Sequence, residues 1–269
     1  MPTATLNGTP YAYVDEGSGP LVVFGHGLLA GREMFRAQID ALRDRYRCVS
    51  VDWPGHGDSG FAPGGWTLWD LAHDAAALVE HLGERRAVVA GLSQGGMASL
   101  RLALERPEIV AALVLMDTSA AAMNPDTLPA LEQVAADMRH GDDATRSAVA
   151  DTVQTVLFGA PWRAREPEAL AREKAHMLAH DPQGQYLAAR AVFDRDDVTE
   201  RLGEIAAPTL VLCGTEDAAT GPDPSRALAE RIPGAELGWI DRAGHHSPIE
   251  EPEAVTRVLE AFLARVAPG

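Results

Sequence analysis

The chain has 269 residues, of which 46% are hydrophobic and 23% charged, and its formal net charge is -16. This composition is typical of a soluble globular protein, and the length fits one α/β domain that carries an insertion. The negative charge argues against nucleic acids and anionic membranes as partners, because like charges repel each other.

The sequence shows no sign of a secretory signal or of a membrane-spanning segment. The N-terminal stretch MPTATLNGTP lacks the basic start and apolar segment of a secretory signal, and no apolar run reaches the ~18 residues that a membrane span needs. The two cysteines, Cys48 and Cys213, lie in apolar runs and are expected to be buried and reduced. We therefore expect a cytoplasmic protein.

Short apolar runs alternate with helical patterns along most of the chain. Runs that are apolar throughout are typical of parallel strands covered by helices on both faces. The alternation predicts an α/β fold with a mostly parallel, doubly wound sheet. Strands are expected at 21–24, 48–51, 87–90, 113–116, 210–213 and 237–240, and helices at 68–82, 97–105, 225–231 and 252–266.

One long stretch, residues 120–199, interrupts this alternation. Its pattern is helical, it contains five prolines as helix breakers, and no segment of it reads as a strand. We interpret it as a helical lid inserted between two core strands, so that residues 1–119 and 200–269 together form the core domain. A lid at the carboxyl edge of a parallel sheet would cover any site there.

The segment GLSQGG, residues 91–96, directly follows the third predicted strand. Its pattern G-x-S-x-G places Ser93 between Gly91 and Gly95, and glycines at this spacing let a strand turn sharply into a helix without crowding the serine. The alternative is a glycine-rich turn that happens to contain a serine, so the other strand ends must decide between them.

Polar residues follow the other predicted strands as well. Asp117 comes directly after the fourth strand, Asp217 soon after the fifth, and His245 soon after the last. In an open parallel sheet, ligands bind beyond the carboxyl ends of the strands. A serine, an acid and a histidine therefore follow separate strands in that order.

Five segments together resemble the α/β-hydrolase fold family, and they cover nearly the whole chain. The resemblance implies that Ser93 is the nucleophile, His245 the base and Asp217 the acid that orients the base. The matching segments are the His-Gly pair at 26–27, the run 52–59, GLSQGG at 91–96, the aspartate of CGTED, and Gly-His at 244–245 followed by Glu250 and Pro252.

The chemistry of these side chains fits the implied roles. A serine hydroxyl is a weak nucleophile until a base takes its proton, and histidine titrates near neutral pH. A carboxylate behind the imidazole fixes its tautomer and stabilises the imidazolium. The oxyanion of an acyl-transfer intermediate needs backbone donors, for which the amides of Leu28 and Gln94 are the candidates.

Two of these assignments have a competitor. His246 adjoins His245, and the spacing from Gly-His to Glu250 favours His245 as the base. Asp117 competes with Asp217, because some members of the fold place the acid one strand earlier; the sequence GTED after the later strand favours Asp217.

The serine nucleophile also bears on the reaction, since an aspartate there would suggest a dehalogenase or an epoxide hydrolase. The chain resembles the esterase, lactonase and non-haem haloperoxidase branch, which implies cleavage of a small carboxylic ester or lactone through an acyl-enzyme on Ser93, without a cofactor. A perhydrolase or haloperoxidase-like activity, a thioesterase or a C–C bond hydrolase would use the same triad. The alternative from another functional class is a protein of this fold that binds a ligand and catalyses no reaction.

Three further residues are candidates on the substrate side. Phe158 and Trp162 of the predicted lid are available to line an apolar pocket, with burial in the core of the lid as the alternative. His26 follows the first predicted strand and has two candidate roles, which are contact with the substrate and support of the oxyanion loop. No metal site is expected, because His26 and His56 lack the spacing of metal ligands.

Overall fold

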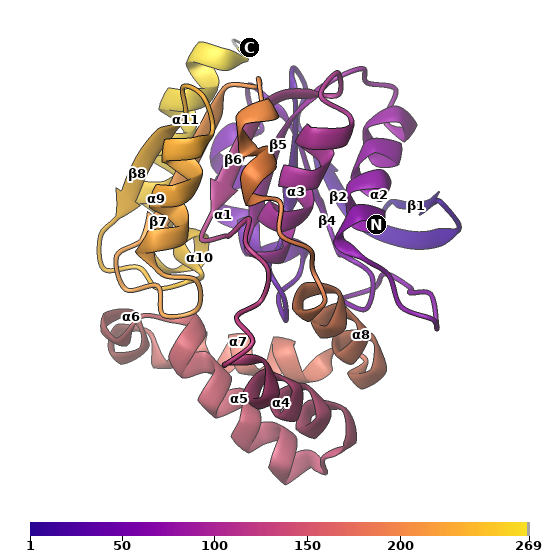
Figure 1. The fold of residues 1–269 in the computed structure, drawn as a ribbon, viewed down its shortest axis with the longest axis vertical. Helices are drawn as coiled ribbons and strands as arrows, with labels where there is room; N and C mark the ends of the chain where they lie inside the picture. Colours follow the sequence, from indigo (N-terminus) through magenta and orange to yellow (C-terminus); the bar gives the residue numbers. More distant parts are fainter. Residues whose placement is uncertain (268–269) are drawn as a thin grey trace.

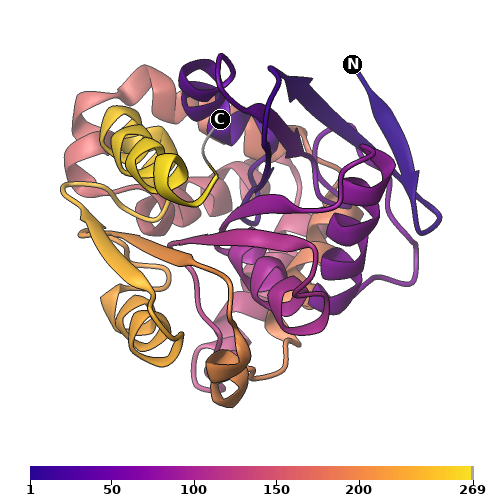
Figure 2. The same cartoon turned by 90° about the horizontal axis from the view of Figure 1, so that it is seen from above.

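The computed structural model describes residues 1–267, and a central eight-stranded sheet runs through it (Figure 1, Figure 2). The strand order is β1-β2-β4-β3-β5-β6-β7-β8. All neighbours from β4 to β8 in this order are parallel, which confirms the predicted mostly parallel sheet. The strands are β1 (Thr3–Leu6), β2 (Thr9–Glu16), β3 (Leu21–Gly25), β4 (Arg47–Val51), β5 (Ala87–Leu92), β6 (Val110–Met116), β7 (Thr209–Gly214) and β8 (Glu236–Ile240).

An N-terminal hairpin, which the sequence analysis did not predict, extends the sheet at one edge. Strands β1 and β2 pair antiparallel, and β2 continues antiparallel onto β4. The two residues between them, Asn7 and Gly8, have φ angles of 45° and 91°. Two consecutive positive φ angles are the geometry of the tight hairpin turns that favour Asn-Gly.

Helices cover both faces of the sheet, as expected for a doubly wound fold. Helices α1 and α11 lie on one face, and α2, α3 and α9 lie on the other (Figure 2). Each face has its own apolar core, with Phe35 and Phe262 on the first and Leu71 and Leu100 on the second. The helices are α1 (Arg36–Leu42), α2 (Leu68–His81), α3 (Gln94–Glu105), α9 (Pro222–Arg231), α10 (Ser247–Glu250) and α11 (Pro252–Val266).

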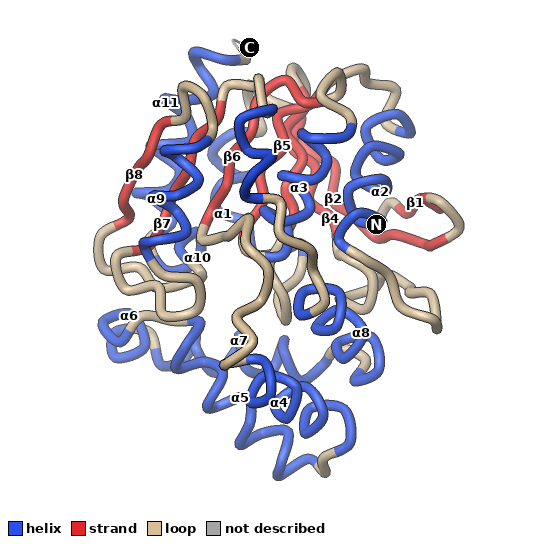
Figure 3. The backbone as a smooth tube through the Cα atoms, in the orientation of Figure 1, coloured by secondary structure: helices blue, strands red, loops and turns tan. Residues whose placement is uncertain are grey.

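A helical insertion, which we define as the residues between β6 and β7, lies below one edge of the sheet in Figure 1. Figure 3 shows helices and loops in it and no strand, as the sequence predicted. Asp142 and Asp181 cap two of its helices by accepting backbone N–H groups. Its main helices are α4 (Leu128–His140), α5 (Asp143–Leu157), α6 (Ala160–Arg165), α7 (Pro167–Ala179) and α8 (Pro182–Phe193).

Hydrogen bonds attach the insertion to loops at the carboxyl edge of the sheet. The amide of Gly57, after β4, donates to Nδ1 of His180 at 3.0 Å. The amide of His246, after β8, donates to the carbonyl oxygen of Leu157 at 3.1 Å. The insertion therefore sits against the strand ends at which the sequence places the candidate site. Its exact boundaries and its action as a lid stay predictions.

Among residues 1–267, no helix is both long enough and apolar enough to span a membrane.

Candidate functional site

Ser93 occupies the corner between β5 and α3 in a strained backbone conformation. Its φ is 49° and its ψ is -114°, a combination that residues with a side chain rarely adopt. Its amide donates to the carbonyl oxygen of Met116 at 3.0 Å, and its own carbonyl accepts from the amide of Met97 at 2.9 Å. Backbone bonds to β6 and α3 thus hold the serine in this conformation.

The glycines beside Ser93 allow two backbone segments to approach closely. A Cβ on Gly95 would lie 2.1 Å from the carbonyl oxygen of Gly25, and one on Gly91 would lie 2.3 Å from the carbonyl carbon of Gly95. No side chain fits at such distances, so the G-x-S-x-G pattern is a packing requirement of this corner. Ser93 is itself partly exposed, whereas its neighbours from 91 to 96 are buried.

Two histidines hold the loop after β3 against this corner. His26 is fully buried; its Nδ1 donates to the carbonyl of Gly27 at 2.7 Å and its Nε2 accepts the amide of Trp53 at 2.9 Å. The Nε2 of His56 accepts the amide of Leu29 at 3.1 Å. Burial lowers the pKa of His26 to about 3, so the ring stays neutral and can accept. This geometry fits support of the loop, the second of the two roles predicted for His26.

Gln94 directly follows Ser93, and Leu28 directly follows Gly27, where an added Cβ would lie 3.3 Å from the Cβ of Ser93. Their neighbours are engaged, since the amide of Leu29 donates to His56 and the amide of Gly95 donates to the carbonyl of His26 at 3.1 Å. Among the hydrogen bonds of residues 1–267, none uses the amide of Leu28 or of Gln94. Both amides are thus available as donors beside Ser93, as an oxyanion site requires.

His245 and Asp217 form a buried pair beyond β7 and β8. The Nδ1 of His245 lies 3.0 Å from Oδ1 of Asp217, and the two residues are 3% and 7% exposed. Thr220 adds two further donors to the carboxylate, its amide to Oδ1 and its hydroxyl to Oδ2. With Nδ1 bound to the carboxylate, the lone pair of Nε2 is left to accept a proton.

The charges of this pair stabilise each other. Burial on its own raises the pKa of Asp217, but the charge and hydrogen bond of His245 and the donors of Thr220 hold it well below its usual value. Burial likewise lowers the pKa of His245, but the charge and hydrogen bond of Asp217 outweigh it and raise the pKa. Asp217 is therefore ionised at neutral pH beside His245.

Asp117, the competing acid, is bound to other groups. Its carboxyl accepts the amide of Gly214 at 2.7 Å and the hydroxyl of Ser247 at 2.5 Å. Burial and the adjacent charge of Asp217 raise the pKa of Asp117 to about 8, since two neighbouring buried carboxyls resist ionising together. The geometry favours Asp217 over Asp117 as the partner of His245.

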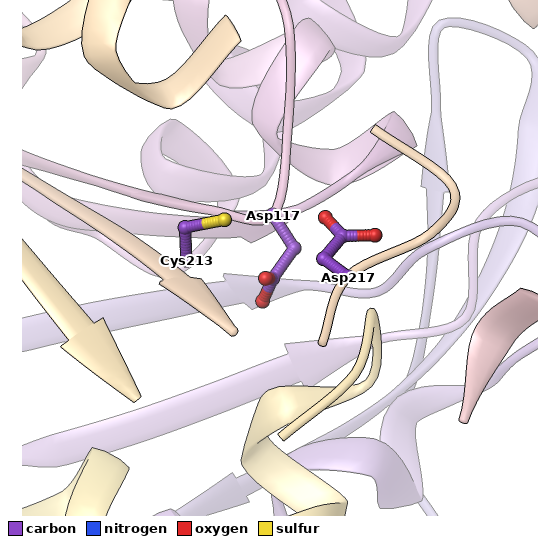
Figure 4. A group of neighbouring side chains, drawn as sticks. All are labelled: Asp117, Cys213 and Asp217. Atoms are coloured by element: carbon purple, nitrogen blue, oxygen red, sulfur yellow. The ribbon is translucent and has the colours of Figure 1, made fainter. Parts of the chain in front are cut away.

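Asp117, Cys213 and Asp217 bring three potential metal-binding atoms within 4.8 Å of one another, with Asp117 in the middle (Figure 4). The two carboxyls already accept hydrogen bonds from Gly214, Ser247 and Thr220. Burial raises the pKa of the Cys213 thiol to about 12, so it does not supply the thiolate that metals bind. The donor set does not fit a metal ion.

His246 turns toward the insertion, unlike its neighbour His245. Its ring packs edge-on against Phe158 with centroids 4.8 Å apart, and Phe158 stacks on Trp162 at 4.7 Å. All three side chains are buried, at 3% exposure or less. Phe158 and Trp162 thus join the insertion to the loop of His245, and their contact with substrate stays a prediction.

The sequence analysis assigned no role to two polar residues of this site. Ser247 bonds to Asp117, and Thr220 bonds to Asp217. Both lie in or beside loops, where hydroxyl residues are common for many reasons, so nothing in the local pattern singles them out.

Comparisons with known proteins agree with this architecture. The family model of the alpha/beta hydrolase fold matches residues 20–252. A putative carbamate hydrolase RutD of Stutzerimonas stutzeri is 29% identical over 251 residues, which cover 93% of each chain. A thermophilic esterase of Thermogutta terrifontis superimposes with a TM-score of 0.92 at 31% identity, over 99% of this chain and 98% of the esterase. The enol-lactonase of Burkholderia xenovorans LB400 gives a TM-score of 0.90 at 30% identity, over 98% and 100% of the two chains.

The strain at Ser93 predicts an unusual stability difference between two substitutions. Glycine tolerates the positive φ at no steric cost, whereas alanine keeps the strain of a Cβ. We expect Ser93→Gly to be more stable than Ser93→Ala by about 1 kcal/mol. Glycine relieves the backbone strain, but its unfolded chain is more flexible, and this entropy offsets part of the gain. Urea unfolding of both variants measures this difference. Equal stability, or a less stable glycine variant, would show that the corner is unstrained.

Proposed function

The chain belongs to the α/β-hydrolase fold family, and on this premise we propose that it is a serine hydrolase that cleaves a carboxylic ester or a lactone through an acyl-enzyme on Ser93. The pairing of His245 with an ionised Asp217 at 3.0 Å is the observation that carries the proposal. The likeness to an esterase and to an enol-lactonase, both at 30% identity or above, supports this substrate class. The net charge of -16 favours a small molecule over a nucleic acid.

In the proposed reaction, Nε2 of His245 takes the proton of the Ser93 hydroxyl while the serine oxygen attacks the carbonyl carbon. The tetrahedral intermediate collapses, the bond to the leaving oxygen breaks, and His245 returns the proton to that oxygen. Water then attacks the acyl-enzyme by the same route, with His245 as the base again. The products are a carboxylic acid and an alcohol, or one hydroxy acid from a lactone.

The other residues of the site lower the energy of the charged species in these steps. Asp217 keeps the proton of His245 on Nδ1 and stabilises the imidazolium that forms. The free amides of Leu28 and Gln94 are proposed to bind the oxyanion; one such donor contributes about 3 kcal/mol to the transition state in a related site. These donors are backbone groups, so their direction is set by the fold.

Carbamate hydrolysis is a second candidate, because a relative with 29% identity over 93% of the chain is named a putative carbamate hydrolase. A carbamate also presents a carbonyl carbon to Ser93 and would pass through a carbamoyl-enzyme. Rates on matched aryl esters, lactones and carbamates separate the two candidates. Faster turnover of the carbamate would replace the ester assignment.

The assignment of the acid predicts a large difference between two conservative variants. Asp217→Asn should lower kcat on an aryl ester by about 10⁴-fold, because the amide favours the wrong tautomer of His245. Asp117→Asn should cost less than about tenfold, because an amide can still accept from Gly214 and bond to Ser247. Steady-state kinetics of both variants test this, with Ser93→Ala as the inactive reference. The reverse order of losses would transfer the role to Asp117.

The electrostatics of the pair predict the pH dependence. His245 must be neutral to accept a proton, and its pKa in the folded protein is raised. Activity should therefore be low at acid pH and rise through a single limb, with a midpoint in kcat/KM above the ordinary histidine value of about 6.5. Initial rates between pH 5 and 9, at pH values where circular dichroism shows intact protein, measure the midpoint. A midpoint at or below the ordinary value contradicts this electrostatic account.

A further inference from the structure

One buried carboxylate, that of Glu250 at the end of α10, binds the backbone on both sides of His245. Its Oε2 accepts the amide of Gly244 at 2.8 Å, and its Oε1 accepts the amide of His246 at 3.1 Å. The same Oε2 also accepts the amide of Gly159, in the insertion, at 2.8 Å. A single side chain thus joins the loop of the proposed base to the corner between α5 and α6.

Other contacts reinforce this junction. The amide of His246 also donates to the carbonyl of Leu157, and the ring of His246 packs against Phe158. From α6, Nη2 of Arg165 donates to the backbone carbonyl of Glu250 at 3.2 Å. The two segments are also in close backbone contact, because a Cβ on Gly244 would lie 2.3 Å from the nitrogen of Gly159.

The carboxylate of Glu250 is so deeply buried that it needs its hydrogen bonds to the backbone. The side chain is 1% exposed, and an isolated carboxylate at such a depth is costly. Burial raises its pKa, while the three amides and the nearby charge of His245 oppose that rise. The carboxylate therefore depends on donors from both segments, and the two segments depend on it.

We propose that Glu250 is a positioning residue that fixes the backbone of His245 and makes the Gly159 corner of the insertion part of the support of the active site. A displacement of this corner from the core then also displaces the base. The inference rests on the proposed role of His245.

Glu250→Gln is the most direct test, because a carboxamide has one acceptor atom in place of two. If its oxygen stays beside Gly159 and Gly244, its NH2 group faces the amide of His246, donor against donor. If the amide is flipped, the other two donors lose their acceptor. The matched control is Glu253→Gln, which makes the same chemical change at an exposed position of α11.

We expect Glu250→Gln to lower kcat on an aryl ester by about 10²-fold, as a small misplacement of a catalytic group does, with KM changed by less than about threefold. The charged and titratable groups that face His245 are Asp217, Asp117, His246 and Glu250. Removal of the charge of Glu250 should lower the pKa of His245 and shift the acid limb to lower pH. Glu253→Gln should change neither quantity.

Two readouts do not depend on turnover. NMR titration of the His245 ring, assigned by its loss in His245→Ala, should give a lower pKa in Glu250→Gln. Hydrogen exchange should become faster at the amide of His246 if the oxygen of the carboxamide stays beside Gly159, or at the amides of Gly159 and Gly244 if the carboxamide is flipped. These two results test the proposal even if the wild type hydrolyses no ester, an outcome that would refute only the proposed function. An unchanged titration and an unchanged exchange rate would overturn the role of Glu250.

A variant in the insertion tests the junction from its other side. Gly159 has a φ of -60° and the preceding Phe158 is extended, so the dihedral angles of proline are allowed at this position. The proline ring, however, would replace the amide hydrogen that points at Oε2 of Glu250, 2.8 Å from the nitrogen, and its Cβ would lie 3.1 Å from the same oxygen. Gly159→Pro therefore removes the donor and also pushes this corner away from Glu250. We expect kcat to fall by at least about tenfold, as for other supporting residues, although the charge of Glu250 is retained. This variant also covers the case in which Glu250→Gln does not fold. Wild-type kcat in Gly159→Pro would exclude the insertion from the support of His245.

Discussion

The close approach of two backbone segments at Ser93 is the constraint on which the site depends. Strand β5 must turn into α3 at a residue with positive φ, while the carbonyl of Gly25 passes within contact distance of Gly95. The turn places the serine at the carboxyl edge of the sheet and the start of α3 behind it. The same turn brings Gln94 to the loop that precedes Leu28, so the proposed nucleophile and the proposed oxyanion donors belong to one backbone corner.

The two buried acids at the neighbouring strand ends differ in pKa because their electrostatic surroundings differ. Asp217 pairs with His245 and stays ionised, whereas Asp117 is surrounded by buried groups and by the charge of Asp217, which favour its neutral form. Two acids of the same chemical type thus take different roles because their surroundings differ. Asp117 joins β7 and the loop of His245 through Gly214 and Ser247, and so helps to hold the charged pair in place.

Much of the fold could be predicted from the sequence, because buried parallel strands are apolar throughout. All six predicted strands are present, and helices α4 to α8 lie within the stretch 120–199 that the sequence predicts to be helical. The hairpin of β1 and β2 was missed, although the Asn7-Gly8 turn is a recognised signal, and so was the short helix α1. The bonds of Glu250 to Gly159 join residues far apart in the chain, so no local pattern predicts them. Site residues at the strand ends could be proposed because a parallel sheet brings those ends to one edge. The substrate contacts of the insertion could not be predicted, because they depend on side-chain packing.

The central claim is that Ser93 is a nucleophile activated by His245, and covalent labelling tests it most directly. The protein would be treated with an aryl organophosphonate, and the labelled peptide identified by mass spectrometry. The account predicts one adduct on Ser93, loss of rapid labelling in His245→Ala, and nearly unchanged labelling in His246→Ala. An adduct on another residue, or rapid labelling of Ser93 without His245, would contradict it.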